Sequence, residues 1–530
     1  MATGRWPALV LIPAAVAAMV AIDDGYERPA PDALEIPLAA QGLGPVASPE
    51  DAISTTWFCA GGTADESGNA DHLVRIVNAG AGDLVGTVTV IPNQPDPPSA
   101  PEPDPVEAGG ATTSTTPPTT VPPTTAAPTT LPPVPDEVVV PVEVPSGAAT
   151  EVRLADHIDS SFAAGLVELD GGGAVVEHEL SGANGSDVAP CASQPSSTWY
   201  FAAGETTADA LEFLVFFNPF PDPAVVDVTF RTEEDLRSPE EFQGLVIPAR
   251  SVVRREIGDF VTRRQHVSTS VVARSGRLVV DRIMLFDGTA GRTGLDVALG
   301  APEPAEVWYS PDGVVAESIA ERFIVYNPGD TRAEVDLTLE PVDPSIGPIE
   351  PFQLTIPPEG FQELVVSDEE RIGAAVDAAG VPFLRHGTRI VSLNEVPVVV
   401  ERTSVGAAGT ARAGYDIAAT TPMLTDRAVL MPDGQGDGGI VAVQNRDGEA
   451  VAEVTVVTAS GEEIHALEVP AASTVDIDLS ELSGGDEVLV LESTVPVAVE
   501  RRRILGDDAA VAHTIAVPIA GHVTRPAPPG

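Results

Sequence analysis

The stretch that decides the fold runs from Ser197 to Asp287. It holds the segments TWYFAAG (198–204), FLVFFNPF (213–220), VVDVTFR (225–231), LVIPARSVVRREI (245–257) and VSTSVVARSGRLVVDRIMLF (267–286). These segments are rich in β-branched residues, alternate apolar with polar positions, and are punctuated by Asn-Pro and Ser-Gly pairs. That pattern is typical of short strands joined by turns. With roughly six or seven strands in about 100 residues, the stretch predicts an antiparallel β-sandwich module.

The same order of segments recurs in the next part of the chain. Trp199 and Asn218 are 19 residues apart, and Trp308 and Asn327 have the same spacing (218 − 199 = 327 − 308). From each Asn to the Pro of the following Ile-Pro pair the distance is again equal, 30 residues (248 − 218 = 357 − 327). Equal distances over two separate intervals indicate a structural repeat.

Two less regular copies flank this pair. A shorter fourth copy keeps the order of segments around Asn445 but lacks the opening Trp. The first copy opens with TTWFCAG at Thr55, and its second half comes late, because Pro145 lies 67 residues after Asn78 (145 − 78). The excess of 37 residues (67 − 30) is close to the length of a Thr- and Pro-rich tract. This tract is therefore predicted to be an insertion within the first module.

We accordingly predict an all-β fold, with four tandem Ig-like antiparallel β-sandwich modules after an N-terminal signal or anchor helix. The predicted divisions are a signal peptide or signal anchor at 1–24, an extended stalk at 25–54, β-module 1 at 55–195 with a disordered insertion at 93–135, β-module 2 at 196–304, β-module 3 at 305–425, β-module 4 at 426–520 and a flexible tail at 521–530.

One further helix is predicted, in module 3, from the segment DEERIGAAVDAAG. Ser367 is expected to cap its N-terminus, with Glu370 completing a capping box, and Gly380 is expected to end it. The other copies have shorter turns at the position equivalent to this helix. We therefore interpret the helix as an insertion in a loop.

The chain is strongly acidic. Its formal net charge is −51, from 79 acidic and 28 basic residues, and the latter are all arginine. A field of that sign repels a phosphate backbone, so no nucleic-acid partner is expected. High negative charge serves solubility, and it also attracts divalent cations.

Residues 1–24 have the pattern of a secretory signal or a signal anchor. They begin with a short basic end at Arg5, continue as an almost uncharged run, and close with an acidic pair. Ala15 and Ala17 suit a signal peptidase, whereas the run is also just long enough to cross a bilayer. A buried N-terminal strand or helix is the alternative. We expect an extracytoplasmic protein at the cell envelope, either secreted or held to the membrane by this segment.

Two low-complexity segments follow. The stretch 25–54 is rich in Pro and Ala, and we interpret it as a stalk that holds the folded part off the membrane. The tract 93–135 has too few large apolar residues to offset the entropy of ordering, so we expect it to stay extended and solvated. Its Thr and Pro content suits O-glycosylation on an exported protein, and an unmodified spacer is the alternative.

The two cysteines, Cys59 and Cys191, lie near the two ends of the interrupted first module. An exported protein meets an oxidising compartment, so a disulfide between them is predicted. Two free buried thiols are the alternative.

No catalytic, cofactor-binding or metal-binding residue is predicted. The motifs of a zinc protease, a nucleophile elbow, a Walker loop and a dinucleotide fold do not occur. The eight histidines show no metal-ligand spacing: His72, His157, His178, His266, His386, His465, His513 and His522. The turn from Asp433 to Gly438 resembles a calcium loop but lacks its spaced carboxylates and closing Glu, so a flexible hairpin is favoured.

Each module ends a strand with an acidic residue followed by a basic or imidazole one. The four pairs are Glu177-His178, Asp281-Arg282, Glu401-Arg402 and Glu500-Arg501. Neighbouring residues on a strand point to opposite faces, so the two members of a pair cannot bind each other. We expect a structural role, with one member packing across the sheet or stacking on the Trp that opens the module.

The segments TWYFAAGET, LVIPARSVVRREIGDFV and VSTSVVARSGRLVVDR together resemble an uncharacterised family of exported actinobacterial envelope proteins. The resemblance covers most of the chain, from about Thr55 to Pro518, and is loosest in module 4. It implies export, membrane anchoring and β-modules, and it supplies no catalytic residues.

Two functions from different classes follow from these observations. The first is a non-enzymatic envelope protein whose modules act as a scaffold or an adhesion surface, with a cell-wall polymer or other envelope proteins as partners. The alternative is an extracellular hydrolase, for example on glycans, that uses two carboxylates roughly 5 to 10 Å apart in a cleft. Modules in a row without a shared cleft favour the first function, and acidic residues that converge in one pocket favour the second. A third possibility is that calcium rigidifies the modules.

Overall fold

The computed structural model describes residues 42–93, 136–316, 319–406, 414–431, 439–446, 448–482, 487–505 and 510–526. These residues belong to one compact unit, which spans 40–530. The predicted signal or anchor at 1–24, the tract from residue 94 to 135 and the Asp433 turn lie outside the described residues. Within the described residues, no helix has the length and apolar character that crossing a bilayer requires.

The described residues are mostly strand, and their sheets are antiparallel apart from single parallel bridges, so the predicted all-β class is confirmed. The strands fall into four sets, called modules 1 to 4 below. Module 1 consists of β1 (Ser54–Ala64), β2 (Asp71–Asn78), β3 (Leu84–Pro92), β4 (Val138–Val144), β5 (Ala149–Arg153), β6 (Ser160–Asp170), β7 (Ala174–Gly182) and β8 (Gly185–Pro190). Module 2 consists of β9 (Thr198–Phe201), β10 (Ala210–Asn218), β11 (Ala224–Thr232), β12 (Leu236–Arg237), β13 (Gln243–Ile247), β14 (Ser251–Glu256), β15 (Val267–Ser275), β16 (Val279–Asp287) and β17 (Thr293–Leu299).

The second half of the chain continues in the same way. Module 3 consists of β18 (Val307–Val315), β19 (Ile319–Asn327), β20 (Ala333–Pro341), β21 (Phe352–Ile356), β22 (Gly360–Val365), β23 (Leu384–Ser392), β24 (Val399–Gly406) and β25 (Gly414–Ala419). Module 4 consists of β26 (Leu424–Leu430), β27 (Ile440–Asn445), β28 (Ala452–Thr458), β29 (Glu463–Val469), β30 (Ser473–Asp478), β31 (Leu489–Leu505) and β32 (Ala510–Ile515). The short strands β33 (Val517–Pro518) and β34 (Val523–Thr524) then pair with β26.

All four modules pair their strands in one scheme. The first order is β4-β3-β6-β1, β13-β11-β15-β9, β21-β20-β23-β18 and β29-β28-β31-β26. The second order is β5-β2-β7-β8, β14-β10-β16-β17, β22-β19-β24-β25 and β30-β27-β31-β32. In module 4 a single 17-residue strand, β31, belongs to both orders: its first half pairs with β28 and its second half with β27. In the other modules, two separate strands joined by a turn take these two positions. The repeat in the sequence is therefore a repeat of topology. The assignment of the modules as Ig-like stays a prediction.

The predicted alternation of apolar and polar residues appears directly in burial. Along β11, Val226, Val228 and Phe230 are buried, while the residues between them are only partly so. The same alternation holds along β20. The buried side chains of β11 share one core with Phe213 and Phe217 of β10, which belongs to the other strand order of the module. The buried side chains at alternate positions of the two sheets therefore form the core of the module.

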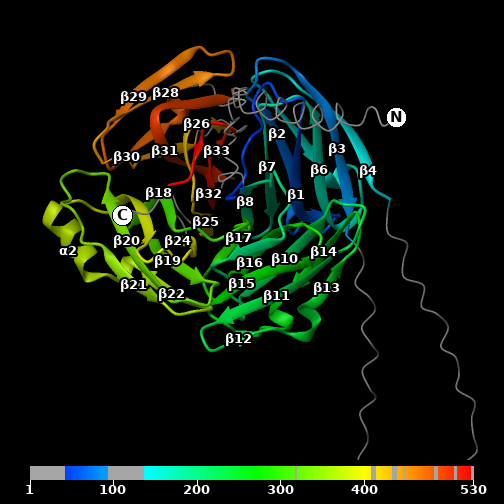
Figure 1. Ribbon diagram of the computed structural model, residues 1–530, viewed down its shortest axis with the longest axis horizontal. Coiled ribbons are helices and arrows are strands. Elements are labelled where there is room, and N and C mark those ends of the chain that lie inside the picture. Colours follow the sequence, from blue (N-terminus) through cyan, green and yellow to red (C-terminus); the bar gives the residue numbers. More distant parts are fainter. Residues whose placement is uncertain are drawn as a thin grey trace, which may run out of the picture. The chain divides into compact units, whose positions relative to one another are not determined.

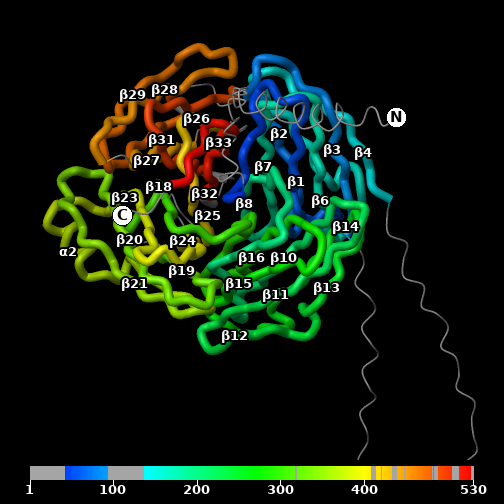
Figure 2. The backbone as a smooth tube through the Cα atoms, viewed as in Figure 1, coloured from blue at the N-terminus to red at the C-terminus, as the bar shows by residue number. Residues whose placement is uncertain are grey.

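The modules contact one another in a closed ring (Figures 1 and 2). Module 1 contacts module 2 through β1 and β16, module 2 contacts module 3 through β17 and β25, and module 3 contacts module 4 through β18 and β31. The ring closes where β32 of module 4 contacts β8 of module 1. Strands β8, β17, β25 and β32 meet at its centre, and each contacts the next. We call these four the inner strands.

The equal spacing from Asn to Pro has a direct cause. The Asn218 side-chain nitrogen donates to the carbonyl oxygens of Ile247 and Pro248, at 3.1 and 3.0 Å, and to that of Asp222, while its oxygen accepts from Phe220 N. Asn327 and Asn445 donate in the same way to Pro357 and Pro470. The Asn therefore ties its own turn to a second turn of the module, and the distance between the two is fixed by this contact.

The predicted disulfide is present. Cys59 on β1 and Cys191, just after β8, are bonded, with a sequence separation of 132 and both residues buried. Strands β3 and β4, on either side of the Thr- and Pro-rich tract, pair with each other over seven positions from Leu84↔Val144 to Val90↔Val138. The tract therefore leaves and re-enters the same sheet.

The predicted helix is present, but its start differs. The helix α2 runs over Glu370–Ala379 and ends at Gly380, which has the left-handed conformation expected of a C-terminal cap (φ 70°). Its N-terminal cap is Glu369 without a side-chain hydrogen bond, so the predicted capping box of Ser367 and Glu370 is wrong. The reason is a 3-10 turn at Val366–Asp368, which takes up Ser367 before the helix begins. Equivalent 3-10 turns stand at Leu154–Asp156, Ile257–Asp259 and Leu479–Glu481.

Both ends of the described chain differ from expectation. The last part of the predicted stalk is packed rather than free, because Leu43 and Ala47 are buried and Ala47 N donates to Pro518 O at 2.8 Å. The predicted flexible tail at 521–530 contains β34 (Val523–Thr524), which pairs with β26, and Val523 is buried. The sequence shows neither contact, because the paired residues are far apart along the chain, 100 positions for Leu424 and Thr524 and 471 for Ala47 and Pro518.

Replacing the buried Asn218, the last residue of β10, is expected to be costly. Asn218→Ala leaves buried carbonyl oxygens without a donor, so we expect it to lower the free energy of unfolding by about 2 to 4 kcal/mol. Urea denaturation of the full chain measures this loss. Asn69→Ala is the control, because Asn69 is exposed and should change stability by less than about 0.5 kcal/mol. Equal effects of the two substitutions would contradict the role given to Asn218.

Candidate functional site

The four acidic-basic pairs join the modules to one another. In each case the basic residue of one module approaches the acidic residue of the next. The Arg282 guanidinium donates twice to Glu401, at 3.0 Å each, Arg402 donates to Glu500, and Arg501 donates to Glu177 at 2.6 Å. His178 Nε2 lies 3.5 Å from Asp281 Oδ2. These four contacts follow the ring of modules once around and close it.

The alternation of side chains along a strand produces this arrangement. The pairs lie on β7, β16, β24 and β31, each of which is flanked by strands on both sides in the second strand order. Strand β16 is buried along nearly its whole length. Its Asp281 side reaches module 1, and its Arg282 side packs on Phe201 of its own module and reaches Glu401 of module 3. Asp281 therefore faces module 1 while Arg282, its neighbour, faces module 3. All eight residues of the pairs are buried.

The expected structural role is confirmed, but the predicted partner is not. Arg282 lies over the ring of Phe201, 5.2 Å from its centroid, rather than on Trp199. Trp199 is held elsewhere, because its indole nitrogen donates to Leu278 O at 2.9 Å. The acidic members also accept backbone N–H groups from the preceding module: Glu401 from Ala203, Glu500 from Asp312 and Asp281 from Ala60.

The contact between modules 1 and 2 differs electrically from the other three. Burial raises the pKa of Asp281 to about 8 and lowers the pKa of His178 well below its ordinary value. Burial also raises the pKa of Glu177, but Arg501, Arg503 and Arg75 outweigh it and lower that pKa overall. The His178–Asp281 contact is therefore uncharged, while the Arg501–Glu177 contact is ionic. A shared apolar core, which contains Phe162 of module 1 and many residues of module 2, holds this uncharged interface.

His178 also meets a second histidine. Its Nδ1 lies 3.1 Å from His72 Nε2, and His72 Nδ1 lies 2.9 Å from Ala163 O. This pair was not predicted, because the two residues are 106 positions apart and are brought together only by the pairing of β2 with β7. The two rings bond to each other, so they do not present their nitrogens to a common ligand.

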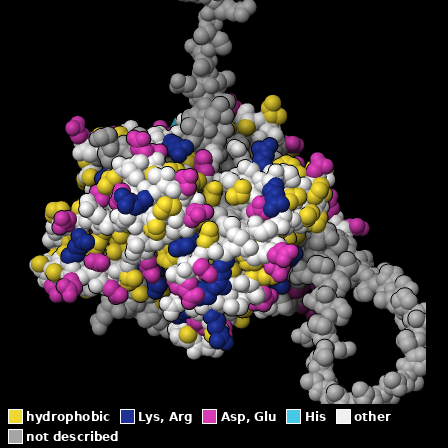
Figure 3. Space-filling model, turned by 60° about the horizontal axis from the view of Figure 1, so that its bottom comes forward, with side chains coloured by type: hydrophobic (Ala, Val, Ile, Leu, Met, Phe, Trp, Pro, Cys, Tyr) yellow, Lys and Arg dark blue, Asp and Glu magenta, His cyan; other side chains and the backbone are white. Residues whose placement is uncertain are grey.

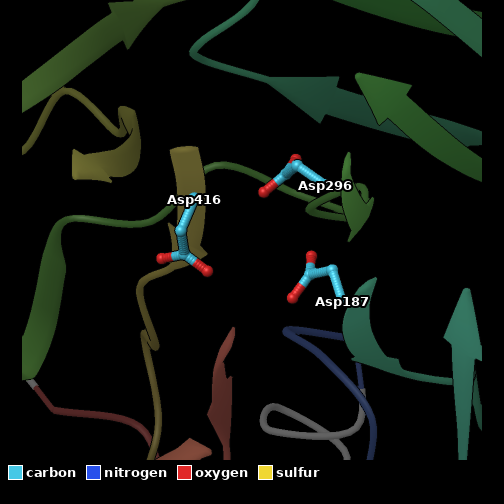
Figure 4. A group of neighbouring side chains, drawn as sticks. All are labelled: Asp187, Asp296 and Asp416. Atoms are coloured by element: carbon cyan, nitrogen blue, oxygen red, sulfur yellow. The ribbon is translucent and has the colours of Figure 1, made fainter. Parts of the chain in front are cut away.

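Three aspartates that the sequence analysis missed meet at the centre of the ring (Figure 4). Asp187 lies on β8, Asp296 on β17 and Asp416 on β25, and one carboxylate oxygen from each lies within 4.8 Å of one from each of the others. The register of β31 with β32 puts Ala512 at the corresponding place in module 4, opposite Arg503. The three copies DVA (187–189), DVA (296–298) and DIA (416–418) were a signal in the sequence.

Each aspartate reaches the next inner strand. Asp187 Oδ2 accepts from Val297 N at 2.8 Å, and Asp296 Oδ1 accepts from Ile417 N at 2.6 Å. Asp416 accepts from both His513 N and His513 Nδ1, at 3.1 and 2.7 Å. The three side chains are buried, and this burial, with the repulsion between them, raises the pKa of Asp187 and of Asp296 well above the ordinary value.

A mostly apolar cavity of about 80 Å³ lies beside the aspartates, between the inner strands. Its walls include Val188, Val297 and Ile417, each of which directly follows one of the three aspartates, and His513 of module 4. Leu43 and its neighbours line another side. Carboxylate oxygens of this kind are ligands for hard cations such as Ca²⁺ and Mg²⁺.

Comparisons with known proteins identify relatives of the sequence but not a function. A model of the family DUF5719, described as a family of unknown function, matches residues 172–466. No curated protein matches the chain. Among solved structures, the chain is similar to a Thermotoga maritima protein, 1070. The two are 15% identical, the match covers 21% of this chain and 97% of the other, and the TM-score is 0.18. The BSP domain of a biofilm-associated protein is 7% identical over 90% of this chain and 98% of its own, with a TM-score of 0.12. The FN1–FN3 domains of chicken CNTN1 are 11% identical over 61% and 99%, with a TM-score of 0.08. These scores are too low to support an argument.

Removing one member of a buried contact between modules is expected to be costly. Arg282→Met leaves Glu401 buried without its partner, so we expect a loss of about 3 to 5 kcal/mol in the free energy of unfolding. Adding Glu401→Gln should recover much of it, because the unpaired charge is then gone. Arg274→Met is the control, since the pair of Arg274 with Asp227 is largely exposed and should be worth less than about 1 kcal/mol. Denaturation with urea compares the four proteins, and similar losses in the two single variants would contradict this account.

The raised pKa of Asp281 predicts a pH dependence of stability. Asp281 holds its proton more tightly in the folded chain than in the unfolded one, so its contribution is greatest at low pH and declines between about pH 4 and its folded pKa of about 8. Asp281→Asn removes this dependence. The wild type should therefore lose stability relative to the variant as pH rises from 5 to 8, by up to about 1.4 kcal/mol per unit.

The measurement is a series of urea denaturations across this pH range. His72 and His178 contribute with the opposite sign below about pH 6.5, because burial lowers their pKa values, but they are common to both proteins and largely cancel. The exposed residue Asp51 provides the control substitution, Asp51→Asn. Parallel stability curves for the wild type and Asp281→Asn would show that Asp281 does not titrate in this way.

Proposed function

Because this chain belongs to DUF5719, a family of unknown function, we propose its function from the geometry of the site: it is a non-enzymatic extracytoplasmic protein of the cell envelope. Its four Ig-like modules act as a scaffold or a binding surface. The observation that carries this proposal is that the polar residues gathered between the modules are buried and used to join one module to the next. Buried contacts of this kind hold the modules rigidly together, as a scaffold requires.

The disulfide supports the extracytoplasmic location. Disulfides persist in oxidising compartments and are rare in the cytosol, and the Cys59–Cys191 bond closes most of module 1. The pattern at 1–24 supports export and contact with the membrane. The Thr- and Pro-rich composition of the tract between β3 and β4 suits O-glycosylation on such a protein.

The alternative, a glycan hydrolase, is less well supported by the same residues. Acidic residues do converge, as that alternative required, but Asp187, Asp296 and Asp416 are buried at the centre of the ring. A glycosidase needs its two carboxylates on either side of a bond in a cleft that a sugar chain can enter. These three are instead bonded to the backbone or to His513 of the adjacent inner strand.

The surface suits a binding role. On the face shown in Figure 3, acidic and arginine side chains are intermixed with hydrophobic ones, even though the chain as a whole carries a formal charge of −51. Mixed surfaces of this kind favour contact with polymers or proteins over binding to nucleic acid. We propose a cell-wall polymer or other envelope proteins as partners.

The proposal is tested with the purified full chain and isolated cell walls. We expect the protein to sediment with the walls and to release no reducing ends from their polysaccharides. Asp187→Asn should sediment as the wild type does, because the residue is buried. Release of reducing ends by the wild type that is lost in Asp187→Asn would establish the hydrolase instead. Failure to sediment would overturn the wall polymer as a partner.

A further inference from the structure

We propose that Asp187, Asp296 and Asp416 form a binding site for one Ca²⁺ ion at the centre of the ring. This inference goes beyond the proposed function and does not depend on it. The three residues come from three different modules, so an ion bound to them would join modules 1, 2 and 3 at one point.

The distances suit calcium. Ca²⁺ is bound by oxygen atoms at about 2.3 to 2.6 Å, so two ligands on opposite sides of the ion are at most about 5 Å apart. One carboxylate oxygen of each aspartate lies within 4.8 Å of one from each of the others, which is within that limit. Figure 4 shows the three carboxylates turned toward the space between them.

Two of the oxygen atoms point independently to a ligand. Asp187 Oδ1 and Asp296 Oδ2 are buried and have no hydrogen-bond partner among the described residues. Their side chains are 97% or more buried, since the residues expose 3% and 0% of their surface. Buried polar atoms are almost always satisfied, so a bare oxygen here calls for a partner that belongs to the site. A cation in the space between the carboxylates satisfies both.

The charges of the surroundings favour the same conclusion. Three carboxylates lie close together out of water, which is unfavourable unless positive charge is supplied. The nearest arginines are already engaged, because Arg282 is paired with Glu401 and Arg402 with Glu500. His513 Nδ1 lies 2.7 Å from Asp416 Oδ2, and its Nε2 lies 3.3 Å from Asp312 Oδ2, so its charge is shared with a further carboxylate. A divalent cation would compensate the remaining charge.

The donor set selects among cations. All three side chains offer oxygen, which hard cations prefer, whereas zinc and copper favour nitrogen and sulfur. Mg²⁺ requires a near-ideal octahedron, while Ca²⁺ accepts irregular geometry and completes its shell with water. Three ligands on separate strands, with Ala512 in the fourth place, do not form a symmetric cage. An irregular set of this kind suits Ca²⁺ better than Mg²⁺.

The experiment uses the full chain after treatment with EGTA. We expect calorimetric titration with CaCl₂ to show one site that binds more tightly than the many surface carboxylates. Ca²⁺ at a hundred times its Kd should raise the Tm by about 3 °C. MgCl₂ at the same concentrations should bind more weakly and stabilise less.

Variants assign the effect to the site. Asp187→Asn and Asp296→Asn keep the shape of the side chain and remove its charge, so each should abolish the tight site and the rise in Tm. Asp330→Asn is the matched control, because Asp330 is exposed and should leave both unchanged. Circular dichroism in EGTA establishes that each variant is folded, and Tb³⁺ luminescence competed by Ca²⁺ tests the wild type without any variant.

Three results would overturn the proposal. The first is a wild-type Tm that neither EGTA nor Ca²⁺ changes. The second is an equal response of the wild type and the folded Asp296→Asn variant, which would place the binding on surface carboxylates. The third is binding of Mg²⁺ as tight as that of Ca²⁺, which would overturn the assignment to calcium.

Discussion

The structure depends on one constraint. Where a strand is buried on both faces, two adjacent polar residues point to opposite faces, and each needs its own polar partner on the face to which it points. Asp281 and Arg282 illustrate it, because one faces module 1 and the other faces module 3. Both are buried, and a buried arginine or carboxylate without a partner costs several kcal/mol. A strand of this kind is therefore stable only between two neighbours.

This constraint explains why the modules form a closed ring. In an open row, the first and last modules would each lack one neighbour, leaving Glu177 and Arg501 exposed or unpaired. Closure brings these two residues, 324 positions apart, to 2.6 Å. It also brings Ala47 near the N-terminal end of the described chain against Pro518 near the other end. The four modules consequently behave as one unit rather than as independent domains in series.

The centre of the ring concentrates polar groups that the periphery does not. Three aspartates and His513 of module 4 meet there on the four inner strands. The four modules differ from one another at two equivalent positions. Ala512 takes the place of a fourth aspartate, and His178 takes the place of an arginine at the interface of modules 1 and 2. Apolar cores are shared both at that interface and at the one between modules 1 and 4, where the contact is ionic.

The sequence by itself determined the repeat, the β class, the disulfide partners and the Asn and Pro positions, because each depends on local periodicity or on a distance fixed within one module. It also showed that the two residues of each acidic-basic pair, such as Glu177 and His178, cannot bind each other. Only the tertiary structure decided where those residues go and that Asp187, Asp296 and Asp416 meet. The physical reason is that a strand's alternation fixes which face a side chain takes, while the neighbour on that face is set by the packing of whole modules. The start of α2 and the packing of Leu43 were missed for the same reason, since both depend on contacts that no local pattern records.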